Sequence, residues 1–281
     1  MNFVDLIRRI CGRFRGGHFL YYWLIRMIPT NRERVLKELN NSFFLVTSTG
    51  RTGTALFTNL LNECIGVQVE HEPIHREQYW HRLALENPVN SHAYISRFRI
   101  KEIFLRKKRG LRYGEVNGAL RRHVKDIRCL VPDAPVIHLV RNGYDVVSSI
   151  MNRATFTKLD WAYRDMIPHS SIVNKDQWVK FSRFEKICFM WSEENRWLNE
   201  CCETTVNFED LINDYTYFNE KFASVLGMEI EESHWRKHVE RKINANRVCE
   251  SANTPENWTE EQHEAFQRIC GNEMRKYGYT Q

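Results

Sequence analysis

The sequence lacks a hydrophobic run long enough to cross a membrane. Its most apolar stretch covers only residues 19–25 and ends at Arg26, whereas a spanning helix needs about 20 apolar residues. Basic residues precede this stretch, as they do in a signal peptide. However, the apolar core is short and no small-residue cleavage site follows it. We therefore expect no transmembrane segment.

Cysteine pairs with redox spacing are also missing. The eight cysteines include no C-x-x-C pair, and they form no set with histidine that has the usual spacing of zinc ligands. They are Cys11, Cys64, Cys129, Cys188, Cys201, Cys202, Cys249 and Cys270. Because most of them stand in apolar or helical contexts, we expect buried free thiols in a reducing compartment, and no metal site.

No repeat, low-complexity segment or linker divides the chain. Its 281 residues are enough for one large α/β domain or two small ones, and contents of 42% hydrophobic and 27% charged residues are ordinary for a globular protein. The net charge of +6 suits an anionic ligand. It is too diffuse to predict nucleic-acid binding.

Residues 43–61 have the pattern of a strand, a glycine-rich loop and a helix. Such a loop offers backbone N–H groups and a helix N-terminus to an anion, and its threonines add hydroxyls. It differs from the ATP-binding motif G-x-x-x-x-G-K-[ST], because Gly50 and Gly53 are only three positions apart and the cation is Arg51 instead of a lysine. Taken alone, the stretch is equally compatible with a tight structural connection.

A second stretch has the same organisation. Residues 136–140 are apolar, Arg141 follows them, and residues 144–150 have the pattern of a helix start that includes Ser149. A strand-end arginine and a hydroxyl in the first turns of a helix can converge on a second phosphate. The alternative is an arginine that pairs with a nearby carboxylate, with a merely solvated serine.

Together, these stretches resemble the two cofactor motifs of sulfotransferases that use 3'-phosphoadenosine 5'-phosphosulfate (PAPS). Residues 50–54 resemble the 5'-phosphosulfate loop in the arginine-containing version of carbohydrate and protein-tyrosine sulfotransferases. Residues 141–149 resemble the 3'-phosphate motif, whose arginine and serine lie eight positions apart. Residues 206–211 and 269–279 resemble a later strand segment and the last helix of this family. The resemblance covers residues 41–279.

The resemblance implies a fold, a cofactor and a set of binding residues. The fold is α/β: a single P-loop-type domain over residues 41–281, with a central parallel sheet flanked by helices. PAPS is the expected cofactor, and PAP (3'-phosphoadenosine 5'-phosphate) the product. The expected cofactor-binding residues are Arg51, Thr52, Gly53, Thr54, Ala55, Arg141, Ser149 and, in a basic C-terminal segment, Arg247. Since Golgi members of the family carry an anchoring helix that this chain lacks, we expect a cytoplasmic location.

The segment of residues 67–75 is predicted to be a second strand that runs into a loop facing the ligand crevice. The transfer needs a base for the acceptor's hydroxyl proton, and carboxylates and imidazoles both serve this purpose. Several branches of the family use a glutamate in an E-P segment, which Glu72 and Pro73 match. Glu72 is therefore the expected base, with His71 and His75 as alternatives. A polar loop with solvated carboxylates remains a further alternative.

Residues 111–117 depart from the family's G-E-K-[ST]-P strand. Val116 stands in place of the lysine and the proline is missing, so one expected sulfate contact has no obvious residue. Arg51, in a catalytic role, or a lysine from elsewhere would carry more of the developing charge. The aromatic residues between 155 and 185 predict either a wall of the acceptor pocket or core packing.

Residues 1–40 carry two arginine-rich helical patterns, broken at Gly16-Gly17 and at Pro29. We favour a helical extension that packs on the domain. The alternative is a basic amphipathic surface that contacts a membrane or a lipid-like acceptor.

The sequence therefore predicts transfer of a sulfuryl group to a hydroxyl or amine of a carbohydrate, lipid or small-molecule acceptor, and no metal ion is needed for it. One alternative is a P-loop kinase that acts on a small molecule. The missing lysine and the lack of a recognisable magnesium-binding carboxylate count against it. The other alternative is a non-catalytic nucleotide-binding module, to which Val116 lends support.

Overall fold

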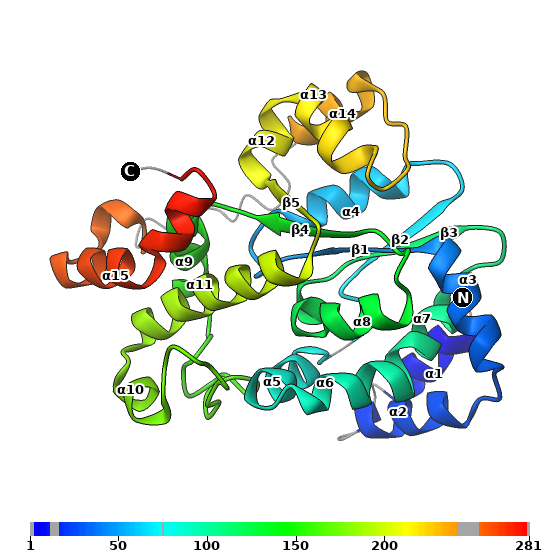
Figure 1. Cartoon of the computed structure of the whole chain (residues 1–281), viewed down its shortest axis with the longest axis horizontal. Coiled ribbons are helices and arrows are strands. Elements are labelled where there is room, and N and C mark those ends of the chain that lie inside the picture. The colour runs from blue at the N-terminus through cyan, green and yellow to red at the C-terminus, as the bar shows by residue number, and fades with distance from the viewer. Residues whose placement is uncertain (1–2, 12–16, 75, 241–252, 280–281) are drawn as a thin grey trace.

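A five-stranded sheet forms the centre of the molecule, with helices on both faces (Figure 1). The computed structural model describes residues 3–11, 17–74, 76–240 and 253–279. The strand order is β2-β3-β1-β4-β5, and all neighbouring strands are parallel. The strands are β1 (Phe43–Thr47), β2 (Val67–His71), β3 (Arg112–Val116), β4 (Val136–Val140) and β5 (Thr204–Asn207). This confirms the predicted α/β fold.

The strand order decides where a ligand site can form. From β1 the chain goes to β2 and β3 on one side, and then to β4 on the other side of β1. In open α/β sheets, ligands bind in the crevice beyond the carboxyl ends of the strands, where the strand order reverses direction. The loops after β1 and β4 therefore lie next to each other. They are the two loops that carry the predicted phosphate motifs.

Alternation along β1 divides the core into two layers. Phe44 and Val46 pack under α4 (Thr54–Asn62), together with side chains from α12 (Phe208–Asn213), α13 (Tyr215–Phe218) and α14 (Glu232–Val239). Phe43 and Leu45 face the opposite layer. All five residues of β1 are buried, as expected for the central strand of a parallel sheet covered on both faces.

The N-terminal helices belong to this second layer. They are α1 (Phe3–Cys11), α2 (Gly17–Met27) and α3 (Arg32–Ser42). Tyr21, Tyr22 and Ile25 of α2 are buried in the same core as Phe43, so the extension packs on the domain, as favoured from the sequence. The opposite face of α2 exposes Phe19 and Trp23. Contact of this face with a membrane stays a prediction.

Further helices complete the layers (Figure 1). They are α5 (Gln78–Glu86), α6 (Val89–Tyr94), η1 (Ile95–Arg99), α7 (Ile100–Arg106), η2 (Gly118–His123), α8 (Val124–Leu130), α9 (Gly143–Met151), α10 (Lys175–Lys180), α11 (Arg183–Cys201), η3 (Asn219–Ala223), η4 (Pro255–Asn257) and α15 (Glu260–Lys276). Within the described ranges, no helix combines the length and the hydrophobicity needed to cross a membrane.

A buried network of charges joins β3 to η1 and α7. Arg99 is fully buried and pairs with Glu77 at 2.6 Å, with Glu102 at 2.5 Å and with Glu115. Although burial lowers it, the carboxylates of Glu115 and Glu77 hold the pKa of Arg99 well above its ordinary value. Burial raises the pKa of the Glu115 carboxyl to about 7, against the opposing charge of Arg99.

Candidate functional site

The backbone of the loop between β1 and α4 has positive φ angles, which few residues other than glycine adopt. Gly50, Arg51 and Gly53 have φ angles of 85°, 59° and 72°, all in the left-handed region. Gly53 is the N-cap of α4, and a Cβ atom there would lie 2.2 Å from Cε2 of Phe208. Glycine is therefore required at this position. Turns of this kind gather backbone N–H groups around an anion, next to the positive end of the helix dipole.

The turn between β4 and α9 lies beside this loop. Arg141 follows β4, and the side chain of Asn142 caps α9 by accepting a hydrogen bond from the backbone N–H of Tyr144. Arg141 Nη1 donates to the backbone oxygen of Arg51 at 3.1 Å, and Arg51 Nε donates to Ser149 Oγ at 2.8 Å. The structure thus brings together the arginine and serine residues that the sequence assigned to two separate phosphate contacts.

Positive charge gathers where the two loops meet. Burial, and then the charges of Arg153 and Arg141, lower the pKa of Arg51 below its ordinary value. Several buried polar atoms here have no hydrogen-bond partner within the described ranges, among them Arg141 Nε, Thr49 Oγ1 and Thr52 Oγ1. Buried polar groups are normally paired. These atoms, together with the crowded arginines, fit the binding of an anionic group.

The segments of residues 206–211 and 269–279 form hydrogen bonds that hold the turn after β4 in place. Glu209, at the start of α12, accepts a hydrogen bond from the backbone N–H of Asn142 at 3.1 Å. Its other carboxylate oxygen accepts from the hydroxyl of Tyr279 at 2.6 Å. Trp191 of α11 donates from Nε1 to the backbone oxygen of Arg141 at 3.2 Å. All four segments that carry the family resemblance are therefore connected in space.

Two cavities, each of about 190 Å³, lie on either side of Arg51. The first is lined by Arg51, Gly53, Thr54, Ala55, Arg141 and Phe208, among others. It contains most of the predicted cofactor-binding residues. The guanidinium of Arg141 lies 5.0 Å from the centre of the Phe208 ring, a cation–π distance. Phe208 thus forms a flat aromatic wall beside the loops that follow β1 and β4.

The second cavity has a different lining. It is bounded by Thr49, Gly50, Glu72, Phe156, Tyr163 and Met190, among others. Phe156 and Tyr163 come from the aromatic stretch of residues 155–185, whereas Trp178 of that stretch is buried in the core. This stretch therefore supplies both a cavity wall and core packing, and the role of this cavity as the acceptor pocket stays a prediction. Apolar walls with a few convergent polar groups are typical of small-molecule sites.

His71 and Glu72 are adjacent in the chain but line different cavities. The Nε2 atom of His71 lies 2.9 Å from Thr54 Oγ1, and His71 lines the first cavity. Glu72 has a φ angle of 41° and lines the second cavity, where Gln78 Nε2 donates to its carboxylate at 3.5 Å. The Glu72 carboxylate lies close to the backbone of Gly118, since a Cβ atom added to Gly118 would lie 3.4 Å from Glu72 Oε1. The turn therefore separates the two candidate bases.

Two predicted residues lie outside the described part of the chain. They are His75, an alternative base, and Arg247, the C-terminal contact to the 3'-phosphate.

Val116 is fully buried and packs in the core beneath α4, so it has no access to either cavity. Cations reach the second cavity from other positions, namely Arg121 and Arg153. Arg121 donates to the backbone oxygen of Gly118 at 2.6 Å and pairs with Glu194 at 3.1 Å. The sequence analysis missed Arg121, Arg153 and Phe208. The position of Arg153, four residues after Ser149, was the only local signal.

No protein-family model and no curated protein matches this sequence. Solved structures do. Sulfotransferase STF1 from Mycobacterium tuberculosis matches with a TM-score of 0.50 at 14% identity, over 90% of this chain and 84% of that chain. A sulfotransferase from Alicyclobacillus acidocaldarius matches with a TM-score of 0.48 at 10% identity, over 85% of this chain and 96% of that chain. Mouse sulfotransferase SULT7A1 complexed with PAP matches with a TM-score of 0.41 at 16% identity, over 86% of this chain and 90% of that chain. On the similarity to STF1, this chain has a sulfotransferase-like α/β fold.

Proposed function

We propose that this chain is a sulfotransferase that moves a sulfuryl group from PAPS to a hydroxyl or amine of a carbohydrate, lipid or small-molecule acceptor. One observation carries the proposal: the two anion-binding loops meet through the contacts of Arg51 with Ser149 and of Arg141 with the Arg51 backbone. A nucleotide with phosphates at both its 3' and its 5' position needs two such sites side by side. The sulfotransferase-like fold supports the same conclusion.

In this proposal the residues of the first cavity hold the nucleotide. Arg51 and the backbone N–H groups of residues 52–55 bind the 5' end, aided by the N-terminus of α4. Arg141 and Ser149 bind the 3'-phosphate. PAPS, when bound, supplies the sulfuryl group. Arg51 stands between the two cavities, where a cation can also stabilise the negative charge that develops during transfer.

Glu72 is the proposed base, which accepts the acceptor's proton in the second cavity. Its position among Phe156, Tyr163 and Met190 supports this role, because these side chains can bind the acceptor's apolar surface. His71 is the weaker candidate, because it contacts Thr54 in the first cavity. We further propose that Arg153 replaces the lysine whose place Val116 takes. Its side chain lines the second cavity, and its charge acts on Arg51.

The test is isothermal titration with PAP, AMP and ATP. We expect PAP to bind most tightly, because only PAP uses both loops. Arg141→Ala should weaken PAP binding by about 10- to 150-fold, since a hydrogen bond to a charged group contributes about 1.5–3 kcal/mol, and should leave AMP binding nearly unchanged. Arg268→Ala is the control, because Arg268 pairs with Glu185 as Arg141 pairs with Asp145, but it stands on α15, away from both loops.

Two outcomes would favour the alternatives. Tight binding of ATP with indifference to the 3'-phosphate would favour a P-loop kinase. Tight PAP binding without turnover of labelled PAPS, on a panel of sugar, lipid and small-alcohol acceptors, would favour a non-catalytic module.

A cytoplasmic location also stays a proposal. It is supported by the seven cysteines in the described part of the chain, all of which are free thiols.

A further inference from the structure

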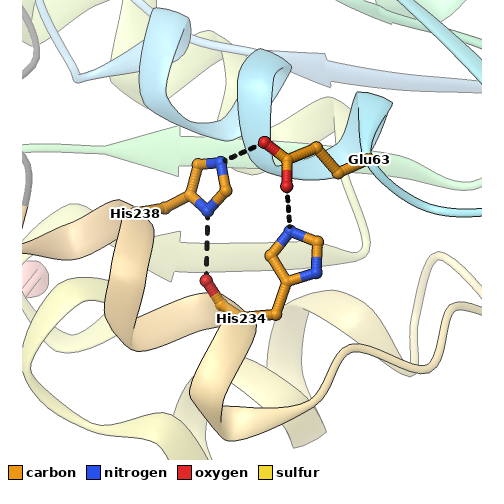
Figure 2. Close-up of side chains that lie close together, drawn as sticks. All are labelled: Glu63, His234 and His238. Carbon is orange, nitrogen blue, oxygen red and sulfur yellow. Dashed lines mark hydrogen bonds and ion pairs between the residues drawn. The ribbon is translucent and has the colours of Figure 1, made fainter.

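Two histidines and a glutamate meet at the end of α4 that is remote from the phosphate loop (Figure 2). Glu63 is the C-cap of α4, and His234 and His238 lie one turn apart on α14. His238 Nε2 lies 3.1 Å from Glu63 Oε1, and His234 Nε2 lies 2.9 Å from Glu63 Oε2. One nitrogen or oxygen atom from each residue lies within 4.8 Å of the other two.

The hydrogen bonding of His238 limits what its Nε2 atom can do. Its Nδ1 atom lies 3.0 Å from the backbone oxygen of His234, which can only accept a hydrogen bond. The proton of a neutral His238 ring therefore sits on Nδ1, and Nε2 presents a lone pair to a carboxylate oxygen. Two acceptors at 3.1 Å repel each other unless the ring takes up a second proton or a cation lies against both atoms.

The same arrangement is the usual one for a metal-binding histidine. Such a histidine donates its other ring N–H to a backbone oxygen or a carboxylate, which fixes the tautomer and the ring orientation. Zinc binds histidine nitrogen at about 2.0–2.1 Å and carboxylate oxygen at about 2.0–2.2 Å, in a tetrahedron, so that neighbouring donor atoms lie about 3.3 Å apart. The observed separations of 2.9 and 3.1 Å, which run from the two histidines to different oxygens of the one Glu63 carboxylate, are close to this value.

We propose that Glu63, His234 and His238 bind a divalent transition-metal ion, with zinc as the ion that suits this donor set. The Glu63 and His234 side chains are 45% and 27% exposed, whereas that of His238 is 2% exposed. An ion therefore has access from solvent, and water can fill a fourth position. Two imidazoles and one carboxylate, without a thiolate, also suit neighbouring metals of the series.

The location indicates a structural role for the ion. Helix α4 has nine residues, a length of about 13 Å, and the phosphate loop lies at its other end. Trp235, between the two histidines, is buried in the same core as Phe57 of α4. An ion bound here clamps α14 to α4, at a distance from the anion-binding loops. This inference is independent of the proposed transfer reaction.

The test is titration of the chelator-treated full chain with Zn²⁺, in competition with a chromogenic chelator. We expect one ion per chain to bind, and we expect His234→Ala and Glu63→Gln each to weaken binding by at least about tenfold, the loss already seen when an outer-shell partner is removed. Lys237→Gln is the matched control. It removes from the same helix turn a positive charge that acts on Glu63, but no ligand, and should bind zinc at least as tightly.

Thermal unfolding is the second measurement. Zn²⁺ should raise the Tm of the wild type and of Lys237→Gln, but not that of the two ligand variants, because an ion that binds only the folded state stabilises it. These variants alter the more exposed members, so that the buried His238 stays in place. Equal zinc affinity in wild type and both ligand variants would place the ion elsewhere, for example on the thiols. No binding at micromolar Zn²⁺ would mean that the two histidines only form ion pairs with Glu63. Either result would overturn the proposal.

Discussion

Two groups of arginine side chains in the described part of this molecule have opposite balances of charge. At the loops after β1 and β4, burial and then the positive charges of Arg153 and Arg141 lower the pKa of Arg51. In the buried network, three carboxylates surround Arg99 and hold its pKa well above the ordinary value, although burial opposes them. An arginine whose charge is already neutralised holds the fold together. Arg51, whose pKa is lowered by burial and by other cations, suits the anion-binding role that we propose for it.

The carboxylates of the buried network and of the second cavity also differ in burial and in their partners. Glu77, Glu102 and Glu115 are buried and each pairs with Arg99. Glu72 is only partly buried, and Gln78 donates to it at the long distance of 3.5 Å. These three carboxylates are fully buried and line neither cavity, so they cannot reach the proton of an acceptor. Glu72, by contrast, lines the second cavity.

The largest effect should come from Glu72→Gln. If Glu72 removes the acceptor's proton, its loss should lower turnover by about 10²- to 10⁴-fold, and leave PAP affinity and Tm nearly unchanged. Labelled PAPS with a working acceptor measures the first quantity, and titration with PAP the second. His71→Gln serves as the comparison, and should retain most of the turnover. Wild-type turnover in Glu72→Gln would refute the assignment.

Breaking the buried network should affect stability instead. Arg99→Met leaves three carboxylates buried without their common partner and should lower the free energy of unfolding by about 3–5 kcal/mol. Arg51→Met removes an arginine from the crowded loops and should change it by less than about 1 kcal/mol. Urea denaturation of both variants measures the difference. Equal losses would mean that the two groups of arginines do not differ in role.

A smaller effect concerns pH. Burial raises the pKa of Glu115 to about 7, against an ordinary value of 4.5. The folded state therefore binds the extra proton between these values, and stability from this group falls as pH rises toward 7 and beyond. Glu115→Gln removes this dependence. The stability of the wild type relative to the variant should thus fall by about 3 kcal/mol between pH 4.5 and pH 8.

Urea denaturation of both proteins at each pH measures this difference, and titrating groups that do not interact with Glu115 cancel in the comparison. A constant difference across this range would show that Glu115 is already ionised at low pH.

Much of the fold could be predicted because its signals are local. The apolar run at residues 136–140 became β4 with the predicted bounds, and the run at residues 43–46 became β1, which extends one residue further to Thr47. Each is a short apolar run that ends at a turn-forming segment, which is typical of a buried parallel strand. The predicted loop and helix then followed β1, with Gly53 at a position that only glycine fits.

The proposed metal site shows what local sequence patterns cannot predict. The spacing of His234 and His238 places both on one face of a helix, and this much can be derived from the sequence, although our sequence analysis overlooked it. Glu63 lies more than 170 positions earlier. Nothing local to it indicates that α4 and α14 will bring it to the histidines. Likewise, Arg99 stands among charged neighbours in the sequence, and only packing against β3 makes it the centre of a buried network.

The sequence alone determined the strand–loop–helix units and the positions of the arginine and hydroxyl groups in the two predicted phosphate motifs, because each depends on the spacing of neighbouring residues. Only the tertiary structure decided which of His71 and Glu72 lines which cavity, since a single turn after β2 sends adjacent side chains to different sides. It also decided that Arg121 and Arg153 line the second cavity, whereas Val116 is buried in the core. Side chains distant in sequence meet only through packing, and packing depends on the whole chain.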